Sequence, residues 1–163
     1  MTAKQNFTTE EWAKLIESTM LASVAITAAE PSGLWGMIQE GFANASGVVA
    51  GASSESALVK EIVEELKTSA GRTIAQDALK QHVKGAKAAE IAGISIAAIA
   101  DVAKIVDAKG GADAVTFKRW IYANAEKVAN AASEGGFLGF GGEKVSEKER
   151  ATLAQLSAAL NLA

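Results

Sequence analysis

The sequence predicts an all-α fold, a single-domain bundle of six or seven helices built around a central apolar helix at about residues 88–108. Three observations lead to this prediction. Apolar residues recur along most of the chain at the three- and four-residue spacing of amphipathic helices. Two of these stretches follow a Ser/Thr-x-x-Glu box, which marks a helix start. No stretch alternates apolar and polar residues between turn signals, as a half-buried strand would.

The first helix is predicted from the capping box formed by Thr8 and Glu11. It should run to about Glu30, because Pro31 cannot continue it. A second, short helix is expected next, and it would carry Trp35, Ile38 and Phe42.

Two amphipathic helices are predicted over residues 55–68 and 73–84, with Gly71 ending the first of them. The first helix buries an aliphatic stripe and presents Glu61, Glu64 and Glu65 as a solvated face. In the second helix, the lone histidine, His82, stands near two lysines and is interpreted as a solvated surface residue. The apolar face of that helix is expected to consist of Ile74, Ala78, Leu79 and Val83.

The helix at 88–108 is the most apolar, so a membrane span is the alternative to test. Residues 91–100 carry no charge, which is well short of the roughly 20 residues needed to cross a bilayer. We therefore expect no transmembrane segment, and a core helix that is covered nearly all round. Its alanines and Gly93 would allow close approach of another helix.

The last two helices have clear start signals. Asp113 is a suitable N-cap for a helix that runs to about residue 132. Ser146 and Glu149 form a capping box at the start of the final helix, which should extend to about Asn161.

Between these two helices lies a glycine loop, residues 135–142, that carries large apolar side chains. Leaving such side chains exposed forgoes roughly 1.5–3 kcal/mol each. They either fill a structural corner beside Trp35 in the monomer or contact another subunit, and Gly136 and Gly139 would permit close backbone approach. The candidate interaction residues are Phe137, Leu138, Phe140 and Trp35.

The composition of the chain argues against several classes of function. With 163 residues, 49% of them hydrophobic, the chain is expected to form one globular domain spanning residues 1–163. A net charge of −3 argues against a nucleic-acid partner, and the absence of cysteine excludes disulfides and thiol catalysis. The N-terminal residues lack the apolar core of a signal peptide, so we expect a cytoplasmic protein.

Catalytic and cofactor motifs are missing from the sequence. One histidine cannot supply the paired Glu-x-x-His units of di-iron bundles or a two-histidine zinc pattern. The glycine loop lacks the preceding strand that a phosphate-binding loop requires. We expect no enzyme activity and no cofactor.

The segment Val128–Leu156, with a fainter echo at Val24–Gly36, resembles the helical TerB-type domains named for tellurite resistance. The acids at the turn of those domains are implicated in metal binding. The resemblance therefore implies a divalent-cation site that uses Glu30 and Glu134, although Glu134-Gly135 stands where those domains usually have Asp-Gly. The string FLGFGG followed by VSxxE is also similar to bacterial proteins of unknown function, which implies no activity.

The sequence thus leads to two hypotheses. In the first, the chain is a non-enzymatic, scaffold-like bacterial protein that binds or assembles as a homo-oligomer. In the alternative, it is a TerB-like stress-response protein that binds a metal ion or a small molecule.

Overall fold

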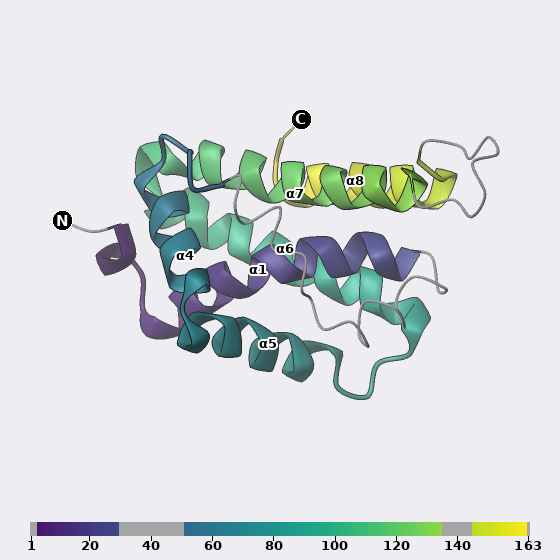
Figure 1. Cartoon of the computed structure of the whole chain (residues 1–163), viewed down its shortest axis with the longest axis horizontal. Coiled ribbons are helices and arrows are strands. Elements are labelled where there is room, and N and C mark those ends of the chain that lie inside the picture. The colour runs from purple at the N-terminus through teal and green to yellow at the C-terminus, as the bar shows by residue number, and fades with distance from the viewer. Residues whose placement is uncertain (1–2, 30–50, 135–144, 163) are drawn as a thin grey trace.

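The structure, a computed structural model, describes residues 3–29, 51–134 and 145–162. In these ranges the chain forms six α-helices, two short 3-10 turns and no strand, which confirms the predicted all-α bundle (Figure 1). The helices are α1 (Thr9–Ala29), α4 (Ala57–Lys67), α5 (Ser69–Val83), α6 (Ala88–Lys109), α7 (Ala114–Glu134) and α8 (Glu147–Ala159). The 3-10 turns are η1 (Ala3–Asn6) and η2 (Gly111–Asp113).

The helices are arranged around α1. Figure 1 shows α7 and α8 side by side along one side of the bundle, α1 and α6 in the middle, and α5 along the opposite side. Helix α1 contacts all five of the other described α-helices, and α6 is its most extensive neighbour. The helix that contacts most of the others is therefore α1, whereas the sequence pointed to residues 88–108.

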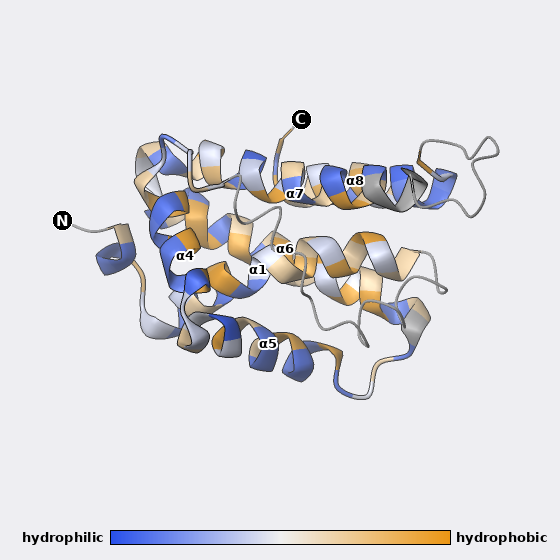
Figure 2. Ribbon diagram, in the orientation of Figure 1, coloured by the Kyte–Doolittle hydropathy of each residue, from blue (hydrophilic) through white to orange (hydrophobic). Residues whose placement is uncertain are grey.

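Small residues explain the central place of α1. Apolar side chains such as Leu15, Ile16 and Leu21 are fully buried, and so are Ala22 and Ala25. Because small side chains let neighbouring helices approach closely, α1 can be packed on several sides at once. Hydrophilic residues gather on the outer side of α5, away from α1 (Figure 2).

Apolar side chains from all six α-helices form one core. Fully burying a Leu, Ile or Phe side chain contributes about 1.5–3 kcal/mol. The largest of these fully buried side chains include Phe117, Ile121, Ile99, Ile62 and Leu156. Phe7 packs beside Trp12, with ring centroids 6.1 Å apart, and extends the core toward the N-terminus.

The junction of α4 and α5 differs from the sequence prediction. Helix α5 begins at Ser69 rather than near Thr73, and Gly71 lies in its first turn instead of ending α4. Thr68 serves both helices: its backbone N–H donates to the Glu65 carbonyl, and its hydroxyl accepts from the Gly71 N–H. A Cβ on Gly71 would lie 2.1 Å from the Glu65 carbonyl oxygen, so this tight corner requires glycine.

One further prediction about a single residue, Ile74, is corrected. Ile74 is 37% exposed and does not belong to the buried face of α5, whose fully covered positions are Ala75 and Leu79. Asp113 lies in η2, and its carboxylate accepts from the Leu58 N–H, 3.3 Å away, at the start of α4. Asp113 directly precedes α7, where the sequence predicts an N-cap, and its carboxylate also supports the start of α4.

Helix α6 keeps one face open to solvent, which corrects the expectation that it is covered nearly all round. Ile99, Val102 and Val106 are buried against the bundle. The opposite line of residues is exposed along the whole helix and includes Glu90, Gly93, Ala97, Asp101, Lys104 and Ala108. Within the described ranges, none of the helices combines the length and apolarity that a membrane span needs.

Candidate functional site

Most of the predicted site residues lie outside the part of the chain that the structure describes. Glu134 is the last residue of α7, and its side chain is also outside that part. The glycine-loop and metal-site predictions therefore stay predictions. The residues outside the described ranges are Glu30, Trp35, Gly136, Phe137, Leu138, Gly139 and Phe140.

The predicted capping box of α8 is confirmed. The Ser146 hydroxyl accepts from the Glu149 N–H at 3.2 Å, and the Glu149 carboxylate accepts from the Ser146 N–H at 2.9 Å. Glu149 is buried, so its carboxylate is committed to this role. Together these bonds satisfy two N–H groups that a helix start leaves without partners.

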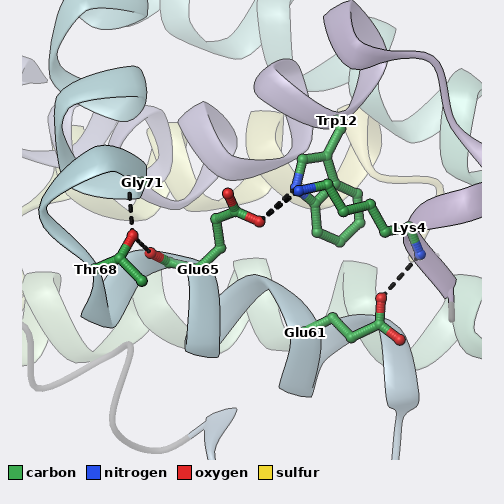
Figure 3. Close-up of polar contacts among 6 residues, drawn as sticks. All are labelled: Lys4, Trp12, Glu61, Glu65, Thr68 and Gly71. Atoms are coloured by element: carbon green, nitrogen blue, oxygen red, sulfur yellow. Dashed lines mark hydrogen bonds and ion pairs between the residues drawn. The ribbon is translucent and has the colours of Figure 1, made fainter.

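An open cleft of about 430 Å³ lies between the N-terminal turn, α1 and α4. The Glu61 carboxylate accepts from the backbone N–H groups of Ala3 and Lys4, at 2.8 and 2.9 Å. Figure 3 shows Glu61 and Glu65 reaching from α4 toward Lys4 and Trp12. Glu61 therefore holds η1 against α4.

Glu65 provides the second attachment of η1. One of its carboxylate oxygens accepts from Lys4 Nζ at 2.7 Å and from Trp12 Nε1 at 3.2 Å. The pKa of Glu65 is lowered, mainly by the hydrogen bond from Lys4. Burial acts in the opposite direction and raises this pKa, while the hydrogen bond from Trp12 lowers it further. Lys4 Nζ also lies 5.4 Å from the centroid of the Trp12 ring, within the range of a cation–π contact.

These contacts correct the reading of residues 61–65 as a wholly solvated acidic face. Only Glu64 fits that reading, since it is exposed and pairs with Lys67 on the same helix. The carboxylates of Glu61 and Glu65 bind the chain's own N-terminal turn, which therefore forms one wall of the cleft. No spacing rule links residue 4 to residue 65, and the sequence therefore gave no signal for this contact.

His82 is exposed, as predicted, but it also pairs with a buried acid, which the sequence did not predict. Its Nδ1 lies 2.5 Å from Oε1 of Glu17, which joins the end of α5 to the middle of α1. Glu17 is 2% exposed and His82 remains partly exposed. A sequence signal for Glu17 existed, since it is the only charged residue between Lys14 and the end of α1.

The pKa of Glu17 is raised, mainly by burial. The charge and the hydrogen bond of His82 lower this pKa, and the charge of Lys14 also lowers it, but burial outweighs them. A carboxyl group and an imidazole at this distance can share a proton. Catalysis or metal binding would need further groups around them, and no cluster of three or more His, Cys, Asp or Glu residues occurs in the described ranges. The pair therefore joins α5 to α1.

The open face of α6 is the remaining candidate, and it is a surface rather than a pocket. Residues 91–100 carry no charge, and Gly93 and Ala97 are exposed in the middle of this stretch. A Cβ on Gly93 would meet no atom within 4 Å. The packing of the described chain therefore does not require glycine at this position.

Comparisons with protein-family models, curated proteins and solved structures find no match to the chain. The resemblance to TerB-type domains stays a prediction.

Proposed function

We propose that the chain is a non-enzymatic binding or assembly protein that associates with itself. The observation that carries this proposal is the uncovered face of α6, the most apolar helix of the bundle. Surface helices ordinarily place charged residues on their outer face. Here the outer face carries no charge between Glu90 and Asp101, where Gly93 and Ala97 are the exposed residues.

Gly93 supports the same function. A glycine in the middle of a helix costs about 0.5–1 kcal/mol relative to alanine. A Cβ at Gly93 would meet no atom within 4 Å in the described part of the chain, so the packing there gives nothing in return for that cost. A second helix that approaches closely would make use of the missing side chain.

The test is the mass in solution of an Ala97→Lys variant. A lysine at the centre of the face would have to lose its hydration when a second copy packs there, so the variant should dissociate at concentrations where the parent remains associated. Ala151→Lys is the matched control, because Ala151 is an exposed alanine on α8. Each new lysine has an acid four residues away, Asp101 or Glu147, so helix stability changes little in either variant.

The predicted glycine loop is tested in the same measurement. A Phe137→Ser/Phe140→Ser variant that dissociates, while Ala97→Lys remains associated, would place the interface at the loop. The reverse result would place it on α6. A monomeric parent would remove the proposed function altogether.

A further inference from the structure

We infer that α6 of one copy packs antiparallel against α6 of a second copy, across a two-fold axis at Ala97. This inference rests on the proposed self-association and specifies its surface and geometry. It follows from two pairs of positions on the exposed face, each placed symmetrically about Ala97.

The outer pair is Glu90 and Lys104, each seven residues from Ala97 in opposite directions. Seven residues are about two helical turns, so both side chains lie on the same face as Ala97. Both residues are exposed. In an antiparallel pair centred on Ala97, Glu90 of each copy faces Lys104 of the other. This gives two Glu–Lys ion pairs that are related by the two-fold axis.

The inner pair is Gly93 and Asp101, each four residues from Ala97. Asp101 already binds Lys104 on its own helix, with 2.8 Å between Oδ1 and Nζ. In the antiparallel register Asp101 faces Gly93 of the second copy, where the absence of a side chain leaves room for the carboxylate. The exposed glycine, which the packing of the described residues does not require, thus acquires a role.

The same charges disfavour a parallel arrangement. In a parallel pair, Glu90 would face Glu90 and Lys104 would face Lys104, and like charges in such positions repel. One oxygen of Glu90 accepts from the Lys87 N–H at the start of α6, at 2.9 Å. A carboxylate has two acceptor oxygens, so this cap and an ion pair with the second copy are compatible.

Cysteine crosslinking tests the two-fold axis directly, because the native chain contains no cysteine. In an Ala97→Cys variant the two thiols would face each other across the axis. A disulfide needs a Cα–Cα separation of about 4.4–6.8 Å, which closely packed helices with small residues provide at the axis. Mild oxidation should convert most of this variant to a covalent dimer, while Ala151→Cys should stay largely uncrosslinked.

Charge reversal tests the register. Lys104→Glu places Glu opposite Glu90 and should raise the dimer dissociation constant at least tenfold in sedimentation equilibrium. Lys80→Glu is the matched control, because Lys80 is equally exposed and binds Asp77 at the same spacing on α5. Adding Glu90→Lys to Lys104→Glu should restore the dimer, and far-UV circular dichroism verifies that the double variant keeps its helices.

The results separate this inference from the proposed function. Crosslinking at Ala97, together with weakening by Lys104→Glu and its reversal in the folded double variant, supports the antiparallel register. A dimeric parent that lacks either the crosslink or the effect of Lys104→Glu overturns the register and leaves self-association in place. A monomeric parent overturns both.

Discussion

At the scale of single residues, the polar contacts of this protein join positions that are far apart in the sequence. Glu61 and Glu65 bind the N-terminal turn, and Glu17 is buried beside His82. Residue type alone favoured solvent for Glu61, Glu65 and His82. The energetic consequence is largest for Glu17, because a buried charge depends on its partner.

Glu17→Gln should make the protein less sensitive to pH. Burial raises the pKa of Glu17 above its ordinary value of 4.5, so the folded state binds this proton more tightly than the unfolded state. The resulting stabilisation is complete below about pH 4.5 and is lost as the pH rises through the raised pKa. In urea unfolding at several pH values, the parent should lose stability relative to Glu17→Gln over that range.

His82 provides the control for this prediction. The imidazole of His82 opposes the effect of burial on the pKa of Glu17. When both proteins also carry His82→Gln, the stability that Glu17 loses relative to Glu17→Gln as the pH rises should therefore become larger. Parallel stability curves for parent and Glu17→Gln would show that Glu17 is solvated rather than buried.

Gly71→Ala and Gly93→Ala should have opposite effects on stability. At Gly71 a Cβ would lie 2.1 Å from the carbonyl oxygen of Glu65, and the forced backbone shift should cost about 1–3 kcal/mol. At Gly93 a Cβ meets nothing within 4 Å, so alanine should gain up to about 1 kcal/mol from helix propensity. Thermal melts at low protein concentration measure both; equal melting temperatures would contradict the packing at the α4–α5 corner.

At the scale of elements, the helix starts could be predicted where the signal is local. Thr8 with Glu11 and Ser146 with Glu149 both form the expected reciprocal bonds. The start of α5 could not be predicted, because Thr68 is both the C-cap of α4 and the N-cap of α5, and because a glycine such as Gly71 usually marks the end of a helix. A residue that serves two elements cannot be assigned from spacing alone.

Ser146→Ala should destabilise the protein by about 1 kcal/mol, because the Glu149 N–H loses its acceptor at the start of α8. A thermal melt compares the variant with the parent. Ser146→Asp is the matched control and should retain most of the stability, since Asp is also a strong N-cap residue. A melt of Ser146→Ala that coincides with that of the parent would contradict the capping argument.

At the scale of the whole molecule, the all-α class and most helix bounds followed from periodicity, while the arrangement of the helices did not. Apolarity suggested residues 88–108 as the centre, but α1 contacts more helices because its small residues admit neighbours on several sides. Helix α6 is the more apolar of the two and still leaves a face uncovered. Which face of a helix is covered depends on distant elements, so that surface could not be predicted from local pattern.

The central claim is that this protein associates with itself, and the mass of the parent in solution tests it most directly. Sedimentation equilibrium over a wide concentration range should give twice the chain mass of 16.7 kDa at high concentration and approach 16.7 kDa on dilution. Ala97→Lys should give 16.7 kDa where the parent is dimeric. A parent that stays at 16.7 kDa at every concentration would contradict the account.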